Sequence, residues 1–591
     1  MNLTHPRVYL SLAALSLLVL APLAIGSPFV YHLFILICTY AALSTAWNIV
    51  GGYAGQLSLG HAVFYGIGSY AATLLVIQFQ LSPWLGMWVG AAISVLVAAG
   101  ISYPSFRLRG PFFALSTIAF LEVIKLLTIH FQGLTGGSAG LSVPLNIGAQ
   151  WMIFREKWAY LLIAFGFLLV TLYVSWRIKR SRLGFYLVAV REREDAALAV
   201  GVNATRVKLI AVVISALLTS LIGSFFSMYI TFIEPGSAFS LDLSIQVAMF
   251  ALIGGLGTVA GPLAGTLLVV PLAEFARGWL SALGSGVHGF LYGIVLVIVV
   301  LTLPKGIVGR FGAALGRWAD RFPSGKRREA AQPAPPPSRA ETAARKGEPL
   351  LVAEHLDKHF GGLHATNDVS ITLHEGEILG VIGPNGAGKT TVFNQLSGFI
   401  VPDSGEVRMR APDGAWLNPA TPNEFARAGV GRTFQIARPF TGLSVLENIM
   451  LGAFLHTSDT EIARSIAIEV AQLTDLTKQL DIEARHLTVG GLKRLEVARA
   501  LATRPRVLLL DEVMAGLNPN DVTKAIEIVR RVRDSGVSVL MIEHVMQATM
   551  ALAERIVVIN AGKILATGLP REVVQNREVI EAYLGEEYVH A

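Results

Sequence analysis

Charged residues are scarce in the first part of this 591-residue chain. No Asp, Glu, Lys or Arg occurs between Val8 and Phe106, although such residues make up 15% of the whole chain. From about residue 350 onward, charge is distributed as in an ordinary water-soluble domain. A charge-free stretch of this length excludes a soluble fold for the first part. The sequence therefore predicts a membrane-embedded half joined to a cytosolic half.

Cysteine is almost absent as well. Cys38 is the only cysteine and lies in an apolar stretch, which excludes an intrachain disulfide or a cysteine metal cluster and leaves it a packing role. The net charge of +7 does not indicate a nucleic-acid partner, because much of the basic excess falls in loops and a linker. Arg7 and the apolar run after it are similar to a signal peptide, but a second apolar run begins at Tyr31. We therefore expect a first transmembrane helix here.

Apolar runs of roughly 20 residues predict the membrane spans. The basic loop Arg177–Arg182 is expected to be cytoplasmic, as are residues beyond 305, so an even number of crossings separates them. The long apolar region 244–276 must then count as two passes, or as one re-entrant and one full pass, which gives about ten helices. The predicted spans are 9–25, 31–50, 57–78, 84–104, 110–131, 158–176, 207–232, the region 244–276, and 286–303.

Two features inside these spans have alternative interpretations. The segment Gly254–Pro262 interrupts a helix, and either lines the transport pathway or supplies small residues for tight helix packing. Glu122 and Lys125 lie one helical turn apart in an apolar span. An ionisable pair in a membrane is a functional hypothesis, but two such residues also neutralise each other. We favour a structural role for this pair.

A glycine-rich segment in the second half fits the P-loop pattern G-x-x-x-x-G-K-[ST] at every required position. It lies between a predicted strand, 377–382, and a predicted helix, 390–397. Backbone N–H groups and the helix N-terminus would bind phosphates, Lys389 would neutralise the β- and γ-phosphates of ATP, and the Thr390 hydroxyl would bind Mg²⁺. The residues predicted to bind the nucleotide here are Gly383, Pro384, Asn385, Gly386, Ala387, Gly388, Lys389, Thr390 and Thr391.

The other nucleotide motifs follow in the order typical of ABC ATPases, which this half resembles. Val507–Glu512 is an apolar strand ending in two carboxylates; Asp511 would reach Mg²⁺ and Glu512 would be the general base for the attacking water. The resemblance implies that Gln435 senses Mg²⁺ and that His544 contacts the γ-phosphate. Phe360 is placed to stack on adenine, although an aromatic residue there could also belong to the core.

The signature loop departs from the usual L-S-G-G-Q pattern. Thr488 keeps a hydroxyl and Gly490 keeps the close backbone approach, but Gly491 stands where the family has Gln. Asn518 stands where many ABC proteins have Asp, in a loop that completes the ATP site of the opposite subunit. Either Gly491 weakens catalysis at that site, or backbone amides bind the nucleotide and the change costs little. Both interpretations stay open at this stage.

The membrane half resembles the permease subunits of bacterial branched-chain amino acid ABC importers. The resemblance spans most of residues 30–305 and rests on three segments, 51–62, 107–115 and 134–141. The segment Asp195–Gly201 fits the E-A-A-x-x-x-G loop of ABC importers, with Asp replacing Glu; in that family a short helix there docks on the ATPase. The C-terminal segment Val579–Glu587 is similar to the end of the matching ATPase subunits.

These observations predict a multi-domain fold. Residues 1–310 form a polytopic all-α transmembrane domain, 311–349 a flexible, basic and Pro-rich linker, and 350–591 an α/β P-loop ABC domain. The resemblance implies ATP-driven, binding-protein-dependent import of branched-chain amino acids across the bacterial cytoplasmic (inner) membrane, with the ATPase in the cytoplasm. It also implies a second permease–ATPase half, usually a different polypeptide, and a periplasmic binding protein, with no nucleic acid.

The alternatives are import of another small solute by the same machinery, such as urea, an amide or an aromatic or other carboxylate, and an ATP-gated channel or receptor.

Overall fold

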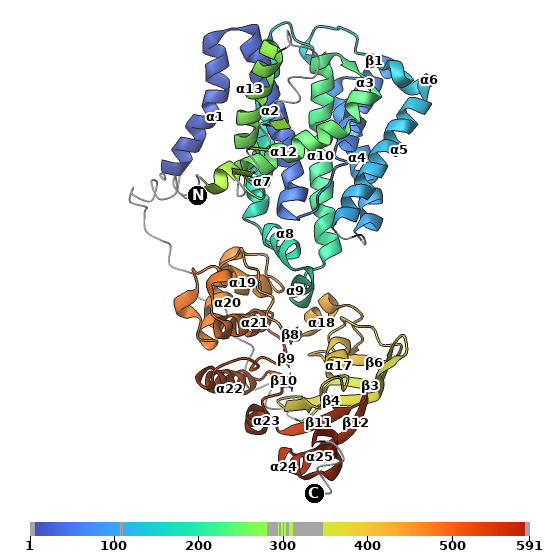
Figure 1. The fold of residues 1–591 in the computed structure, drawn as a ribbon. Coiled ribbons are helices and arrows are strands. Elements are labelled where there is room, and N and C mark those ends of the chain that lie inside the picture. The colour runs from blue at the N-terminus through green and yellow to red at the C-terminus, as the bar shows by residue number, and fades with distance from the viewer. Residues whose placement is uncertain are drawn as a thin grey trace. The chain divides into compact units, whose positions relative to one another are not determined.

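The computed structural model describes residues 6–106, 108, 110–280, 293–294, 297–298, 301–302, 306–310 and 347–584 (Figure 1). The chain divides into two compact units, each with its own core. The first comprises 1–191 and 205–328, and the second 192–204 and 329–591. The predicted span 286–303 falls mostly outside the described residues, as does most of the predicted linker.

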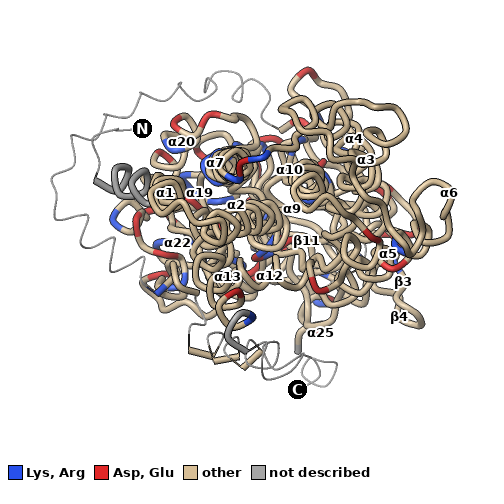
Figure 2. Tube along the Cα trace, turned by 90° about the horizontal axis from the view of Figure 1, so that it is seen from above, with Lys and Arg blue, Asp and Glu red and all other residues tan. Residues whose placement is uncertain are grey.

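The first unit is helical, as its sequence predicts. Seven of its described helices are long and apolar enough to cross a membrane. The main helices are α1 (Pro6–Ile25), α2 (Pro28–Asn48), α3 (Ala62–Phe79), α4 (Pro83–Ser105), α5 (Pro111–His130), α7 (Lys157–Lys179), α8 (Arg182–Glu192), α10 (Ala204–Ile230), α12 (Leu241–Gly255) and α13 (Gly261–Leu280). Helices α2, α3 and α4 carry no charged residue, and Figure 2 colours the charged residues that the other segments contain.

Helix α2 is the centre of this unit, because it packs against α1, α7, α12 and α13. Proline at its first position, Pro28, needs no N–H partner and starts the helix after the left-handed Gly26. At its other end α2 changes into a π-helical turn, Ile49–Tyr53. The predicted span 57–78 is wrong at its start, since residues 54–61 form an irregular, partly buried segment before α3.

The predicted interruption after residue 254 is confirmed, since α12 ends at Gly255 and α13 begins at Gly261. Small residues hold the two helices close together: a Cβ on Gly254 would lie 1.7 Å from the carbonyl oxygen of Gly261. A Cβ on Gly265 would lie 1.9 Å from the carbonyl oxygen of Phe250. Gly254 therefore serves tight helix packing, as one of the two interpretations predicts. This role does not exclude a pathway beside the break.

The pair Glu122 and Lys125 on α5 is an ion pair, with Lys125 Nζ 2.6 Å from a carboxylate oxygen. The two side chains are 42% and 24% exposed and neutralise each other. Their geometry agrees with the structural role that the sequence favours.

The second unit is built on two β-sheets. The larger has the order β12-β11-β5-β10-β9-β8, parallel except for β12, and the smaller is antiparallel with the order β4-β3-β6-β7. The central strands β5, β9 and β10 are buried along their whole length and are rich in Val, Ile and Leu, as a sheet covered on both faces requires. The strands are β3 (Pro349–Phe360), β4 (Leu363–His374), β5 (Ile378–Ile382), β6 (Ser404–Arg410), β7 (Trp416–Leu417), β8 (Val430–Arg432), β9 (Val507–Asp511), β10 (Ser538–Ile542), β11 (Arg555–Asn560) and β12 (Lys563–Gly568).

Helices surround these sheets within the second unit. The short helix α9 (Glu194–Ala199), from the segment 192–204, belongs to this unit rather than to the first. The others are α17 (Lys389–Gln395), α18 (Pro422–Ala428), α19 (Val445–Ala453), α20 (Thr460–Leu473), α21 (Val489–Ala502), α22 (Pro519–Asp534), α23 (Met546–Leu552), α24 (Pro570–Gln575) and α25 (Arg577–Leu584).

Candidate active site

The predicted nucleotide motifs meet at one edge of the larger sheet. The glycine-rich loop follows β5, Glu512 follows β9, His544 comes two residues after β10, and Gln435 comes three residues after β8. Strands β5, β10, β9 and β8 are consecutive and parallel, so their carboxyl ends lie along the same edge. In open α/β sheets this edge is where ligands bind.

The glycine-rich loop has backbone geometry that only glycine accepts easily. Gly388 has a φ of +100°, and a Cβ there would lie 2.3 Å from the carbonyl oxygen of Ala365. The next residue, Lys389, begins α17 and donates from Nζ to the carbonyl oxygens of Gly383 and Pro384 at 2.7 and 2.8 Å. Burial lowers the pKa of Lys389, because its ammonium group has lost part of its hydration. A phosphate anion bound here would stabilise that charge.

Glu512 lies between two of the other predicted catalytic residues. One carboxylate oxygen accepts a hydrogen bond from Gln435 Nε2 at 2.9 Å, and the other lies 2.9 Å from His544 Nε2. Its φ is +46°, an uncommon and strained backbone conformation for a residue that is not glycine. Strain of this kind concentrates at functional sites, and here it places the carboxylate between the two side chains.

Asp511, the last residue of β9, is the best candidate for a metal ligand. It is 3% exposed, and its Oδ1 has no hydrogen-bond partner among the described residues. Burial raises the pKa of Asp511, while Arg432, whose Nη2 lies 4.0 Å from Oδ2, opposes the rise. An orphaned buried carboxylate oxygen suits a hard cation such as Mg²⁺, and the Thr390 hydroxyl and the Gln435 amide, the other two predicted ligands, would also supply oxygen atoms.

The residues of the signature loop begin helix α21. Thr488 is its N-cap and accepts a hydrogen bond from the Gly491 N–H at 3.2 Å. Gly490 cannot be replaced without displacing Asp521, whose carboxylate would lie 2.9 Å from a new Cβ. Gly491 has more room, since the atoms nearest a new Cβ are 3.4 Å away. Asn518 caps the neighbouring helix α22 through the N–H of Asp521 at 2.9 Å.

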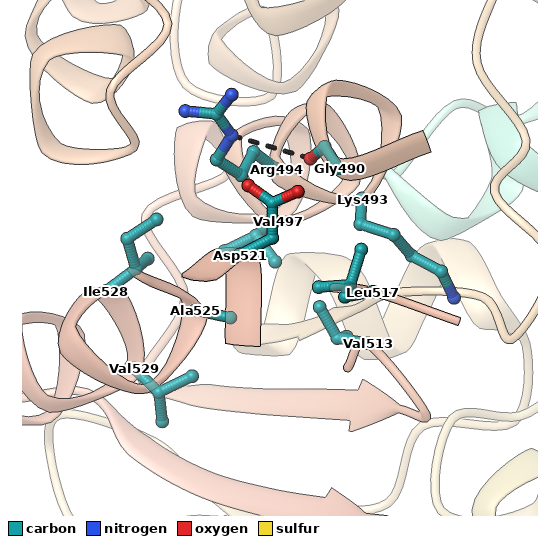
Figure 3. Close-up of a pocket in the computed structure, with 10 residues that line it drawn as sticks. All are labelled: Gly490, Lys493, Arg494, Val497, Val513, Leu517, Asp521, Ala525, Ile528 and Val529. Atoms are coloured by element: carbon teal, nitrogen blue, oxygen red, sulfur yellow. Dashed lines mark hydrogen bonds between the residues drawn. The ribbon is translucent and has the colours of Figure 1, made fainter. Parts of the chain in front are cut away.

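A pocket lies beside the signature loop, between α21 and α22 (Figure 3). Its floor is apolar, and in Figure 3 Arg494 donates to the Gly490 carbonyl oxygen at its rim. Of the predicted site residues only Gly490 lines it, so this pocket is not where the catalytic residues meet. Phe360 does not line this pocket either: it ends β3 with 47% of its surface exposed, which excludes the core alternative.

Two buried cations at this edge are absent from the sequence prediction. Lys493 Nζ donates to the carbonyl oxygens of Gln435 at 2.5 Å and Glu512 at 3.0 Å, and so joins the signature helix to two catalytic residues. Arg432 is surrounded by the rings of Phe393, Phe399 and Phe434, with its guanidinium carbon 4.6–4.9 Å from each centroid. Burial lowers the pKa of Arg432 to about 10, so it stays charged at neutral pH. No sequence motif distinguished either residue from an ordinary surface cation.

The segment 192–204 docks on the rest of the second unit mainly through small residues. Ala196 and Ala197 of α9 are fully buried, and α9 packs against α18. Gly201 has a φ of +84°, and a Cβ there would lie 2.5 Å from Leu455 Cδ1. Glu192 accepts a hydrogen bond from the Gly442 N–H at 3.2 Å. The spacing D-A-A-x-x-x-G thus has a steric basis in this interface.

Arg438 provides the charged contact of this interface. Its Nη1 lies 2.7 Å from Asp195 Oδ2, and its guanidinium carbon lies 4.7 Å from the Phe434 ring centroid. The main chain of Arg438 is held by a buried ion pair on the signature helix: its N–H donates to Glu496, and its carbonyl oxygen accepts from Arg499, both at 2.8 Å. The signature helix is thereby connected to the docked segment through a single residue.

Comparison with known proteins agrees with both halves of this description. Residues 29–300 match the model of the branched-chain amino acid transport system / permease component family, and residues 366–515 match the ABC transporter family. Residues 563–589 match the branched-chain amino acid ATP-binding cassette transporter family.

Several relatives are single ATP-binding proteins. The high-affinity branched-chain amino acid transport ATP-binding protein LivG of Salmonella typhimurium is 40% identical over 255 residues, covering 40% of this chain and 99% of LivG. BraF of Pseudomonas aeruginosa is 39% identical over 254 residues, covering 40% and 98%. The lipopolysaccharide export system ATP-binding protein LptB of Escherichia coli is 36% identical over 241 residues, covering 40% and 98%. A crystal structure of a nucleotide-free ATP-binding cassette has a TM-score of 0.37 at 28% identity, covering 40% of this chain and all of that one.

The fold and the site define an ABC transporter, in which a helical membrane domain is joined to an ATPase that hydrolyses ATP to drive transport. Both family models and the relatives narrow this class further. The chain belongs to the branched-chain amino acid family of ABC transporters and combines its permease and ATP-binding subunits in one polypeptide.

Proposed function

We propose that this chain imports branched-chain amino acids and forms one permease–ATPase half of the transporter. The observation that carries this proposal is the permease match over residues 29–300. The ATPase half alone would not decide the direction of transport, because it is similar both to LivG and to LptB, whose name describes an export system.

In this proposal the residues at the sheet edge divide the work of hydrolysis. The backbone of the loop Gly383–Thr391 and Lys389 bind the phosphates, and Phe360 stacks on adenine. Thr390, Gln435 and Asp511 would hold Mg²⁺, which neutralises phosphate charge when it is bound. Glu512 takes a proton from the attacking water, and the hydrogen bonds from Gln435 and His544 hold its carboxylate in place. Thr488, Gly490 and Gly491 would contact the nucleotide of the opposite ATPase.

The docked segment would carry the ATPase motion to the membrane domain. Within the first unit, Arg191 Nη1 donates to the Gly52 carbonyl oxygen at 2.7 Å, in the π-helical turn that ends α2. From the same turn region, the buried Asn48 donates to the Thr258 carbonyl oxygen and accepts from the Gly257 N–H, both at 2.9 Å. The residue preceding the docked segment is thus linked to two irregular backbone segments, which favours a pathway beside the break.

The proposal also implies partners and a location. A second permease–ATPase half is needed because one chain carries a single nucleotide site and a single signature loop. A periplasmic binding protein would deliver the amino acid, and the site of action would be the bacterial inner membrane with the ATPase in the cytoplasm. The membrane itself is supported by seven apolar helices of sufficient length.

The test is ATP-driven uptake of labelled leucine into proteoliposomes that contain this chain, its partner half and the cognate binding protein. Uptake in the parent and none with Glu512→Gln, which keeps the shape of the side chain but removes the base, would support a hydrolysis-driven importer. Stimulated ATPase activity without leucine uptake would support import of another solute, such as urea, an amide or a carboxylate. If neither activity responds to the binding protein, the ATP-gated channel becomes the better proposal.

A further inference from the structure

Three potential metal ligands gather at the tip of the β3–β4 hairpin. His359 of β3 and His364 of β4 are directly paired across the strands, and Asp357 precedes His359 by two residues. The ligand atoms of the three side chains all lie within 4.8 Å of one another. Among the described residues, no other group of three or more such side chains has metal-ligand spacing.

The carboxylate of Asp357 contacts both imidazoles. Its oxygens are 3.2 Å from His359 Nδ1 and 2.9 Å from His364 Nε2. The two rings are stacked, with centroids 3.9 Å apart and planes inclined by 17°. A metal ion binds in the plane of an imidazole ring, so one ring must rotate before both histidines can bind the same ion. Without a cation, a hydrogen on each imidazole nitrogen would lie between that nitrogen and the Asp357 carboxylate.

The spacing of these atoms matches that of ligands on a tetrahedral metal ion. With Zn–N and Zn–O distances near 2.0–2.1 Å, two ligand atoms on one Zn²⁺ are about 3.3 Å apart. The observed separations of 3.2 and 2.9 Å between Asp357 and the two histidines are close to this value, and rotation of the half-exposed His359 ring would bring its Nδ1 into line with a shared ion. The side chains are 23% (Asp357), 52% (His359) and 34% (His364) exposed, which leaves an open position for water.

The donor types and the local charge select the kind of ion. Two imidazoles and one carboxylate suit Zn²⁺, Ni²⁺ or Cu²⁺, whereas Mg²⁺ and Ca²⁺ prefer oxygen ligands alone. Asp403 adds a second negative charge, with an oxygen 3.9 Å from His359 Nδ1, and Lys358 pairs with Asp403 at 2.6 Å. The three charged groups sum to −1, which attracts a cation.

We propose that Asp357, His359 and His364 form a binding site for a divalent transition metal, with Zn²⁺ as the reference ion. The site is separate from the residues predicted to hold Mg²⁺. Metal binding would join β3 to β4 beside Phe360, whose strand partner is Leu363, and would fix the hairpin that carries this ring.

The experiment titrates the full chain in lipid nanodiscs with Zn²⁺, without nucleotide and without a polyhistidine tag, against a chromophoric Zn²⁺ indicator. We expect one Zn²⁺ per chain, and a dissociation constant raised by at least roughly tenfold in His359→Asn and in His364→Gln. The matched control is His355→Gln on the same strand, which removes an exposed histidine that has a single carboxylate partner, Asp368, at 2.6 Å. No stoichiometric binding by the parent, or equal binding by His364→Gln, would overturn the proposal.

Amide hydrogen exchange gives a second readout that does not depend on affinity. Zn²⁺ should slow exchange in the β3–β4 hairpin of the parent and leave the β11–β12 hairpin unchanged, because the latter has a similar two-residue turn, Ala561–Gly562, and no histidine. Slower exchange in both hairpins, or in neither, would refute binding at this site.

Discussion

Reversing the charge of Asp195 tests whether the docked segment transmits ATPase motion. Asp195 and Arg438 are 46% and 38% exposed, and such pairs contribute about 0.2–1 kcal/mol. Arg438 is also held on its main chain by Glu496 and Arg499 and packs on Phe434, so less entropy is lost on pairing and the upper end of this range applies. A loss of about 1 kcal/mol lowers the ratio of docked to undocked segment roughly fivefold.

The assay is the amount of leucine taken up per ATP hydrolysed in proteoliposomes. We expect Asp195→Asn to lower this ratio by up to about threefold, because a fivefold change in the docking equilibrium lowers an occupancy of about one half to about one sixth. Asp195→Arg should lower the ratio further because two guanidinium groups then face each other. Adding Arg438→Asp to Asp195→Arg should restore most of the ratio. The effect of Asp195→Asn should shrink between about 50 and 500 mM NaCl, since half-exposed charges are screened.

A matched control separates this effect from a general loss of surface charge. Glu581→Gln removes an exposed ion pair with Arg577 at 2.9 Å on α25, and it should leave the ratio unchanged. The reasoning is refuted if the swapped pair transports no better than Asp195→Arg alone, or if the effect of Asp195→Asn does not depend on salt.

Four further changes test other parts of the structure. Burial raises the pKa of Glu543 from 4.5 to about 7, so the stability that its protonated form contributes is fully present below about pH 4.5 and is lost as pH rises through 7. Relative to Glu543→Gln, the parent should lose about 3 kcal/mol of unfolding free energy between pH 5 and 8. Parallel pH dependence of the melting curves of the two proteins would contradict this. Arg432→Lys loses the guanidinium whose Nη1 donates to both Asn394 and Ser397, and should lower the free energy of unfolding of the ATPase by about 2–4 kcal/mol in calorimetry. Asn48→Leu leaves two backbone groups at the helix break without a partner and should abolish uptake while basal ATP hydrolysis continues, whereas normal uptake would remove the break from the pathway. Gly491→Gln places its Cβ no closer than 3.4 Å to any neighbouring atom and should raise turnover of the assembled transporter; unchanged turnover would show that backbone amides suffice.

Much of the second unit could be predicted because its chemistry is local in sequence. The predicted strand 377–382 is β5 within one residue, the predicted helix 390–397 overlaps α17, and the strand before Glu512 is β9. Each motif is fixed by a few adjacent residues, and the parallel sheet then places the motifs along one edge. The membrane spans were predictable for the same reason, since a long apolar run is itself the signal.

The contacts between distant segments could not be predicted. The side chains of Lys493 and Asn48 bond to backbone groups of residues far away in the chain, and the backbone of Arg438 is bonded by the distant side chains of Glu496 and Arg499. Contacts between a side chain and a distant backbone group leave no mark on the side-chain pattern. The π-helical turn after α2 was missed as well, because a single extra residue in a helical turn does not alter apolar spacing enough to be noticed. The strained φ of Glu512 is likewise a property of the folded backbone alone.

The docked segment 192–204 has a consequence for the linkage of the two halves in one polypeptide. LivG matches this chain over 99% of its own length, so a relative of the ATPase half exists as a separate protein. A separate ATPase must find its permease by affinity, whereas here covalent connection keeps the local concentration of each half near the other at an order of millimolar. An interface with a binding free energy of only about 4 kcal/mol is then formed about half of the time or more. Buried alanines, a hydrogen bond to Glu192 and a half-exposed ion pair are therefore enough to keep the segment engaged and still allow it to release within each transport cycle.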